Sequence, residues 1–225
     1  KYTMLRLNLK KILFRICKSK FYNYLCLMFK AYKYRLYPTE SQKVLIHKHF
    51  GAARWVYNYG LAKKISAYQE DKKYLNKFDL CLDLPMLKKQ KETTWLKEVN
   101  AQSLQASLEN LDRAYTKFFR DKNCFPKFKA KHDSRQSFQV PQRASFDFKN
   151  SELYLPKFKN GIKAVFHRGF NGTIKTATIS ITPTGKYFVS ALINIDESIP
   201  LKKPIDESKA VGIDLGIKTF ATLSD

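Results

Sequence analysis

The sequence predicts a mixed α+β fold, and three features of its 225 residues lead to this class. In the first half of the chain, apolar residues recur at three- and four-residue spacing, as they do in helices that bury one face. Residues 125–195 instead alternate apolar and polar side chains, which is typical of half-buried strands. A hydrophobic content of 44% is high enough for a folded core. Helices followed by an all-β segment therefore give a mixed fold.

The chain is expected to open with one strand and a long helical stretch. Phe29–Tyr37 alternates and is rich in aromatic residues, so it predicts a strand that Pro38 ends. Thr39 or Ser41 can cap the next helix through its side-chain oxygen. The spacing of apolar residues places that helix over residues 42–69.

More helices are expected before residue 126. Gly51 and Gly60 lie inside the first helical pattern and argue against one unbroken helix. The lysine-rich residues 71–100 predict short helices and loops. An apolar stripe over residues 104–118 predicts a clear helix, which ends before Pro126.

The second half is expected to form strands. Residues 147–155 and 162–168 each predict one strand, and residues 176–182 and 187–195 predict a hairpin around a Pro-Thr-Gly turn. Residues 196–209 contain two prolines and little apolar periodicity, so they are expected to form a linker.

The net charge of +23, from 42 Lys and Arg against 19 Asp and Glu, indicates an anionic partner. Nucleic acid is the leading candidate, because phosphate contacts release counterions. An anionic membrane surface and a basic protein without such a partner are the alternatives. No run reaches the length of about 18–20 apolar residues that a membrane helix needs, and no pair of the four cysteines has zinc-knuckle spacing. A cytoplasmic protein without a zinc site is expected.

Basic and aromatic residues are concentrated in Arg113–Lys175, which holds 15 Lys or Arg, four Asp or Glu and 12 Phe or Tyr. Aromatic rings can stack on unpaired bases while cations follow the phosphate backbone. Some of these rings are expected in the core instead, namely those of Tyr115, Phe118, Phe119 and Tyr154. Residues 125–131 and 134–138 are hard to pack as a core, so they predict nucleic-acid contact, with a solvated basic loop as the alternative.

A second motif, Val211–Gly216, lies within residues 210–225, which predict a strand, a glycine turn and a strand. It places the Asp214 carboxylate at the end of an apolar strand. An Asp in this position ligates Mg²⁺ in RNase H-like nucleases. In actin-like ATPases a similar turn contacts nucleotide phosphates, and a turn Asp without a ligand is the third possibility. The motif alone does not choose among the three.

Seven segments in this order resemble the TnpB/OrfB proteins of bacterial insertion sequences, which are relatives of type V CRISPR effectors. The resemblance runs from Met28 to Asp225. The segments are Phe29–Thr39, Phe50–Asn58, Trp95–Val99, Leu108–Tyr115 with Phe118 and Phe119, Phe125–Phe138, Leu155–Lys157 with the hairpin at Gly185, and Gly212–Lys218.

The resemblance implies a domain plan. Residues 28–38 and 124–195 would form a β-barrel wedge domain, and residues 39–123 would form an inserted helical recognition lobe with a helix-turn-helix-like start. After the linker, residues 210–225 would be the first strands of a truncated RNase H-like (RuvC) domain. Residues 1–27 are expected to be a basic upstream extension outside the family's domains.

The resemblance also implies the partners and the site residues. Members of the family bind a guide RNA from the transposon end and cut target double-stranded DNA; no membrane partner is expected. Asp214 would be the first RuvC carboxylate and a ligand of catalytic Mg²⁺. The expected nucleic-acid-binding residues are Lys30, Lys33, Arg35, Arg54, Asn58, Lys127, Lys129, Lys131, Arg135 and Gln136.

The expected function is the nucleic-acid-binding N-terminal part of an RNA-guided DNA endonuclease. The family's later carboxylates and its four-cysteine zinc insert have no counterpart here, so this chain alone is expected to be inactive and to bind no Mg²⁺ tightly. A stand-alone DNA- or RNA-binding regulator is the alternative. The beginning of an actin-like ATPase is the weakest interpretation, because nothing before Val211 matches one.

Overall fold

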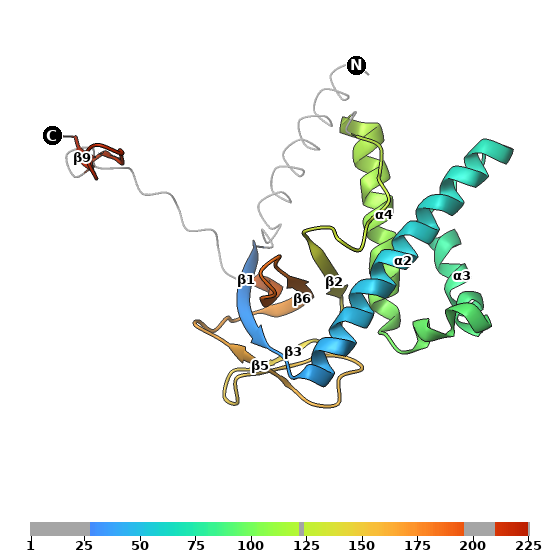
Figure 1. The fold of residues 1–225 in the computed structure, drawn as a ribbon, viewed down its shortest axis with the longest axis horizontal. Coiled ribbons are helices and arrows are strands. Elements are labelled where there is room, and N and C mark those ends of the chain that lie inside the picture. The colour runs from blue at the N-terminus through green and yellow to red at the C-terminus, as the bar shows by residue number, and fades with distance from the viewer. Residues whose placement is uncertain (1–27, 122–123, 196–209, 225) are drawn as a thin grey trace, which may run out of the picture. The chain divides into compact units, whose positions relative to one another are not determined.

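The computed structural model describes residues 28–121, 124–195 and 210–224 (Figure 1). Contacts divide the chain into two compact units; the described residues 28–195 belong to one, and residues 210–224 belong to the other. The predicted extension over residues 1–27 and the predicted linker over residues 196–209 lie outside the described residues.

The larger unit is built on one sheet of seven strands, and every neighbouring pair is antiparallel. The order across the sheet is β2-β6-β7-β1-β5-β4-β3. The strands are β1 (Met28–Tyr37), β2 (Gln136–Val140), β3 (Ser145–Asp147), β4 (Glu152–Tyr154), β5 (Ile162–Val165), β6 (Thr173–Ile181) and β7 (Tyr187–Ile195).

The sheet is curled as a half-barrel, with β2 and β3 as its two edges (Figure 1). The resemblance predicted a β-barrel, but β2 and β3 do not pair with each other. The edge strand β3 and its neighbour β4 are only three residues long, so the ladder ends there. The coarse prediction of a mixed α+β fold is confirmed.

One predicted strand, over residues 147–155, is wrong, because a turn divides it into β3 and β4. The Asp147 side chain accepts hydrogen bonds from the backbone N–H groups of Lys149 and Asn150, both at 3.0 Å. Ser151 then adopts a left-handed φ of 56°. Such a local bond from an Asp side chain offers the backbone an alternative to the ladder.

Four helices lie in the chain between β1 and β2. They are α2 (Glu40–Asp71), α3 (Lys77–Lys89), the 3-10 helix η1 (Lys91–Lys97) and α4 (Ala101–Asp121). The predicted helix over residues 104–118 corresponds to α4. Its expected apolar stripe is buried from Leu104 to Tyr115.

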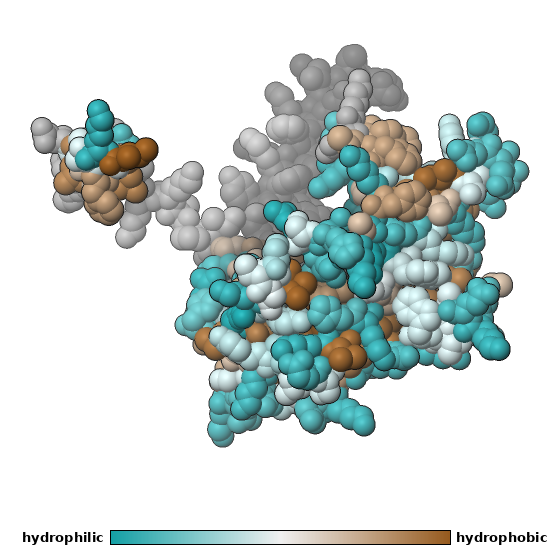
Figure 2. All heavy atoms as spheres, viewed as in Figure 1, coloured by the Kyte–Doolittle hydropathy of each residue, from teal (hydrophilic) through white to brown (hydrophobic). Residues whose placement is uncertain are grey.

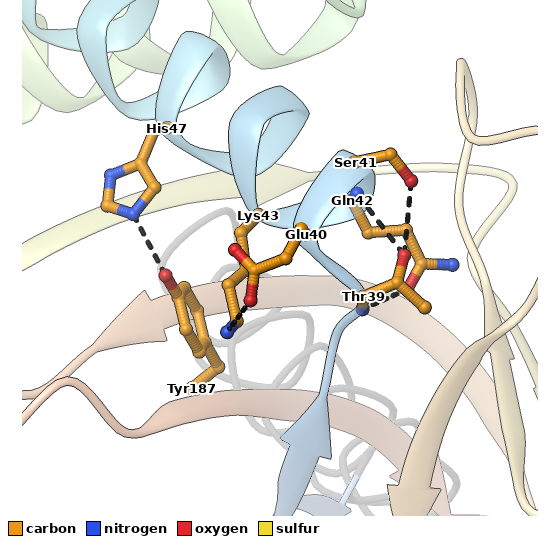
Figure 3. Close-up of polar contacts among 7 residues, drawn as sticks. All are labelled: Thr39, Glu40, Ser41, Gln42, Lys43, His47 and Tyr187. Carbon is orange, nitrogen blue, oxygen red and sulfur yellow. Dashed lines mark hydrogen bonds and ion pairs between the residues drawn. The ribbon is translucent and has the colours of Figure 1, made fainter.

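Helix α2 starts at a capping box. The Thr39 side chain accepts from the Gln42 backbone N–H at 3.4 Å, and the Gln42 side chain accepts from the Thr39 N–H at 3.0 Å (Figure 3). Of the two predicted caps, Thr39 is therefore the one used. About two turns after Thr39, His47 is hydrogen-bonded to the Tyr187 hydroxyl of β7 at 2.8 Å (Figure 3), which helps to hold α2 on the sheet.

The expectation that two glycines interrupt this helix is wrong, since α2 runs through both over 32 residues. At Gly60 the reason is packing. A Cβ atom there would lie 2.8 Å from Leu108 Cδ2 and 3.0 Å from Leu111 Cδ2 of α4. The glycine therefore lets α2 and α4 approach closely, and that contact outweighs its low helix propensity.

Two hydrophobic cores share α2. Its first turns cover the inner face of the sheet, where Ile46 and Phe50 pack with Tyr34 and Leu36. Its later turns pack among α3, η1 and α4 around a leucine-rich core. The side of α2 that carries the buried apolar residues therefore changes along the helix. The members of the second core include Leu61, Leu80, Leu96, Leu104, Leu108 and Leu111.

A buried histidine ties α2 to the start of α4. The His49 Nδ1 atom lies 2.8 Å from the Leu45 carbonyl oxygen, and Nε2 accepts from the Asn100 N–H at 3.1 Å. The ring stacks on those of Phe138 and Phe158. Burial lowers the pKa of His49, so the neutral ring is the form that fits these two bonds.

Residues 210–224, the smaller unit, form a strand, a glycine turn and a second strand, as predicted. β8 (Ile213–Asp214) pairs with β9 (Thr222–Leu223), and the Gly216 N–H donates to the Thr219 carbonyl in the turn. Most of its apolar side chains are exposed, those of Ile217 and Phe220 above all.

Candidate nucleic-acid interface

One face of α2 carries polar and aromatic residues at helical spacing: Lys48, Gly51, Arg54, Trp55 and Asn58. All five line one groove, and Arg54 also lines a neighbouring groove together with Phe50 and Ala53. The loop groove lies between α2 and residues 124–137, and holds a cavity of about 40 Å³. The tryptophan groove lies between α2 and η1, with a cavity of about 360 Å³. Arg54 lines both, so the two grooves form one continuous surface.

The basic loop, residues 124–135, is fastened to this surface by Asn58. The side-chain amide of Asn58 donates to the Lys129 carbonyl at 2.9 Å and accepts from the Lys129 N–H at 2.8 Å. Gln136 then holds the end of the loop, since its amide donates to the Lys131 carbonyl at 2.8 Å. Both predicted site residues therefore position the loop through its backbone.

The predicted cations of the loop differ in their surroundings. The ammonium group of Lys129 lies 4.1 Å from the centre of the Tyr57 ring. Removal from water lowers the pKa of Lys129, and the Asp133 carboxylate offsets only part of that effect. The side chains of Lys127, Lys131 and Arg135 are exposed. Lys129 is thus distinguished by its contact with Tyr57 of α2, although the residue as a whole is exposed like the other three.

A second cationic cluster lies on the outer face of the sheet, opposite the side that α2 covers. Arg35 of β1 is paired with Phe188 of β7, and its guanidinium lies 5.1 Å from the Phe188 ring and 5.4 Å from the Tyr37 ring. The Lys33 ammonium lies 4.5 Å from the same Phe188 ring. One buried nitrogen of Arg35, Nη1, has no hydrogen-bond partner among the described residues. Lys30 is exposed nearer the start of β1.

Most of the cations expected at the interface form no ion pair within the described part of the chain; Lys129 lies in the field of Asp133. The ion pairs there leave out Arg54, Arg135, Lys127, Lys131, Lys33 and Arg35. Figure 2 shows that hydrophilic side chains cover most of one face of residues 28–195, with apolar side chains gathered towards the ends of α2 and α4. Uncompensated positive charge on an ordered surface is what phosphate contacts require.

Sequence reasoning missed several residues of this surface. Trp55 and Trp95 lie in segments that carry the family resemblance but were not among the expected binding residues, and Lys48 and Phe188 were not singled out. Trp95 meets Trp55 only through folding, since 40 positions separate them in the sequence. Of the rings expected in the core, Tyr115 is buried, whereas Phe119 is 66% exposed and Tyr154 is 41% exposed.

Asp214 stands at the end of β8 with its surface exposed. No three His, Cys, Asp or Glu side chains gather as a metal site among the residues that the structure describes. The described residues therefore do not fit a Mg²⁺ site by themselves. In the same parts of the chain, no helix has the length and apolar character needed to cross a membrane.

A family model for a helix-turn-helix domain, HTH_OrfB_IS605, matches residues 28–73. In this structure the matched range holds β1 and the continuous helix α2, not two helices joined by a turn. The match therefore falls on the elements that carry Lys33, Arg35 and Arg54.

Two relatives match most of the chain. It is 34% identical over 196 residues to “Putative RNA-guided DNA endonuclease InsQ” of Escherichia coli K12, a match covering 87% of this chain and 47% of that protein. It is 32% identical over 197 residues to “Putative RNA-guided DNA endonuclease” of Streptomyces pristinaespiralis, covering 87% of this chain and 48% of that protein. The chain spans about half the length of these relatives.

A shorter relative is “Virulence protein VsdF” of Salmonella dublin, 36% identical over 114 residues, which covers 47% of this chain and 96% of that protein. Among solved structures, a cryo-EM structure of a Cas12f1–sgRNA–target DNA complex aligns with a TM-score of 0.36 and 13% identity, over 88% of this chain and 54% of that one. The family model and the two long relatives agree along the sequence, and the chain belongs to the TnpB/OrfB family.

Proposed function

We propose that this chain is the nucleic-acid-binding N-terminal part of a transposon-encoded RNA-guided DNA endonuclease that acts in the cytoplasm. Its partners in this proposal are a guide RNA and target double-stranded DNA. The half-barrel would serve as the wedge domain, and residues 39–123 would serve as the recognition lobe inserted into it. The names of the two long relatives support this assignment.

The observation that carries the proposal is the continuous surface around Arg54. It combines an ordered basic loop, exposed cations without acidic partners in the described part of the chain, and aromatic rings at the surface. Cations neutralise phosphates and aromatic rings stack on unpaired bases, so this combination suits RNA or opened DNA. The cluster of Lys33, Arg35 and Phe188 offers a second contact on the outer face of the sheet.

Salt dependence tests the proposal. If several phosphates are neutralised, affinity for a duplex or an RNA hairpin should fall about tenfold or more between 50 and 200 mM salt. The triple change of Lys127, Lys131 and Arg135 to Ala should weaken binding at low salt. It should also reduce the slope of log K against log salt by about one for each phosphate that the variant no longer neutralises.

The matched control changes three exposed lysines of the helical region, Lys73, Lys89 and Lys91, to Ala. It removes the same charge from the protein but leaves the loop intact. Lys129 is kept in both variants, because its packing on Tyr57 is structural. Equal loss of affinity in the two triples would mean that net charge, and not the loop, governs binding. A flat salt response of the unmodified chain would exclude phosphate-dominated binding.

Catalysis enters the proposal through Asp214, as the first carboxylate of a RuvC-type site in which Mg²⁺ would assist phosphodiester hydrolysis. That chemistry needs further carboxylates beside Asp214, and the described residues offer no such group. The nuclease activity is thus assigned to the family's complete site, and nucleic-acid binding is assigned to residues 28–195.

A second function, a stand-alone nucleic-acid-binding protein, is favoured by one observation. The match to VsdF covers 96% of that protein but only 47% of this chain, so a short protein can consist almost wholly of the shared region. Binding of DNA or RNA without any effect of a guide strand would favour this second function. Guide-dependent recruitment to a matching duplex would favour the first.

A further inference from the structure

The tryptophan groove has the features of a nucleotide site. It is lined by Lys48, Gly51, Arg54, Trp55, Trp95 and Glu98, together with Asn58. Its volume of about 360 Å³ lies at the lower end of small-molecule sites, which span about 300–1,000 Å³. The absence of a side chain on Gly51 keeps the floor open, since a Cβ there would meet only the Arg54 guanidinium at 4.0 Å.

Aromatic rings held in place form the walls. The rings of Trp55 and Trp95 meet edge to face, with centroids 5.8 Å apart, and Trp55 stacks on Tyr59 at 5.5 Å. The Trp95 indole N–H donates to the Glu92 carbonyl at 3.1 Å, which fixes its ring, yet Trp95 is 37% exposed. A fixed and exposed indole is a ready platform for stacking.

Charge is distributed unevenly around these rings. On one side, Lys48 and Glu98 form an ion pair, so the carboxylate there disfavours a phosphate. Arg54, by contrast, forms no ion pair among the described residues and also lines the loop groove, where Lys129 and Arg135 outnumber the one carboxylate, Asp133. A ligand that is flat and uncharged at one end and anionic at the other matches this arrangement.

We propose that the tryptophan groove holds one unpaired nucleobase of a bound strand, stacked on Trp95, with the adjoining phosphate at Arg54. The proposal rests on the nucleic-acid-binding function given above. A base inside a duplex has both faces covered by its neighbours and offers only its edges, so the groove selects single-stranded, looped or flipped-out bases. It thereby adds base stacking to a surface that otherwise binds phosphates.

Fluorescence tests this site directly, because the chain has only two tryptophans and both line the groove. The probes are a single-stranded DNA, the same sequence as RNA, the blunt DNA duplex, and an abasic phosphodiester strand of equal length. Both single strands should quench tryptophan emission at saturation. The duplex and the abasic strand should bind through their phosphates without that quenching. Comparing the DNA and RNA arms shows which kind of strand the groove prefers.

Variants separate stacking from phosphate binding. Trp95→Ala should weaken single-strand binding about 5- to 150-fold, the effect of removing the platform for one stacked base, and leave duplex binding unchanged. Trp95→Phe should retain most of the affinity, because it keeps a ring. Phe119→Ala is the matched control, since it removes an exposed ring at the far end of α4. Thermal unfolding shows whether each variant folds.

Two results would overturn the proposed base site but not the proposed function. One is equal quenching by the duplex or the abasic strand, and the other is an equal loss of single-strand and duplex affinity in a folded Trp95→Ala variant. If Trp95→Ala does not fold, the quenching series of the unmodified chain and Trp95→Phe decide the matter. If none of the four probes binds, the proposed function itself fails, and that outcome differs from the other two.

Discussion

Helix α2 contributes residues to two hydrophobic cores: the sheet core, which includes Tyr34 and Leu36, and the helical core formed with α3, η1 and α4. The two cores are stabilised in different ways. Around the sheet, aromatic rings pack between long strands; Tyr34 meets Phe166 at a right angle, and its hydroxyl donates to the Arg168 carbonyl at 2.8 Å. The backbone ladder supplies much of the order there. In the helical core, no ladder of backbone hydrogen bonds joins one helix to the next. This core depends on leucine packing, on the close approach at Gly60, and on one buried ion pair.

The binding surface lies where these two cores meet. In consecutive positions of α2, Ala52 belongs to the helical core, Ala53 belongs to the sheet core, and Arg54 faces the grooves. A change in either core should therefore disturb binding through the position of α2. The comparison predicts that the helical core is the more fragile of the two, because single residues carry more of its stability.

The buried ion pair should give the largest effect. Lys64 donates to Asp112 at 2.8 Å, its side chain is only 4% exposed, and its ammonium lies near the rings of Tyr74 and Tyr115. Asp112→Ala would leave that charge buried without a counterion, which costs about 3 kcal/mol. Urea denaturation followed by circular dichroism would measure the loss of unfolding free energy.

The neighbouring exposed pair is the control for Asp112. Arg113 donates to Glu109 at 2.7 Å, but both side chains are well exposed. Arg113→Ala should therefore cost no more than about 0.5 kcal/mol. If both variants lose equally little stability, the Lys64 ammonium reaches water once Asp112 is gone, and the helical core does not depend on this pair.

The two glycines of α2 should give opposite effects of intermediate size. At Gly60, an added methyl group must displace Leu108 or Leu111, and overpacking of about 1–3 kcal/mol exceeds the gain in helix propensity. At Gly51 the space is open, so Gly51→Ala should stabilise the protein by about 0.5–1 kcal/mol. Thermal unfolding of the two variants would show the difference in sign. Equal shifts in the same direction would mean that α2 and α4 are not closely packed at Gly60.

These features explain how far the sequence could be interpreted. Alternation predicted β1, β6 and β7, and the leucine spacing predicted α4, because in each case the pattern and its cause lie within one element. The role of Gly60 depends on Leu108, and the tryptophan groove depends on Trp95, both far away in the sequence. Composition indicated a nucleic-acid partner, but folding decided which lysines also contact an aromatic ring of the protein. Lys129 shows this, since it packs on Tyr57 while Lys127 and Lys131 do not.

The smallest expected effect concerns His49, which links the sheet core to the start of α4. Its neutral ring accepts the Asn100 N–H at the start of α4 while it stacks on Phe138 of the sheet. Burial lowers the pKa of His49 in the folded state, relative to an unfolded value of about 6.5. The folded protein therefore binds this proton less readily than the unfolded chain does, so stability is fully present above about pH 6.5. It should fall as the pH drops below that value and towards the folded pKa.

Urea denaturation at intervals from about pH 7.5 to 5.5 would show this slope, in a range where the ordinary carboxylates stay ionised. His49→Gln should be less stable at neutral pH, because it loses the fit between the rings, but its stability should change less with pH over the same range. His47→Gln is the matched control, since His47 is exposed and bonded only to the Tyr187 hydroxyl among the described residues. It should keep the slope of the unmodified chain. If the slope persists in His49→Gln and vanishes in His47→Gln, the pH-sensitive contact lies between α2 and β7, and the two cores are not coupled through His49.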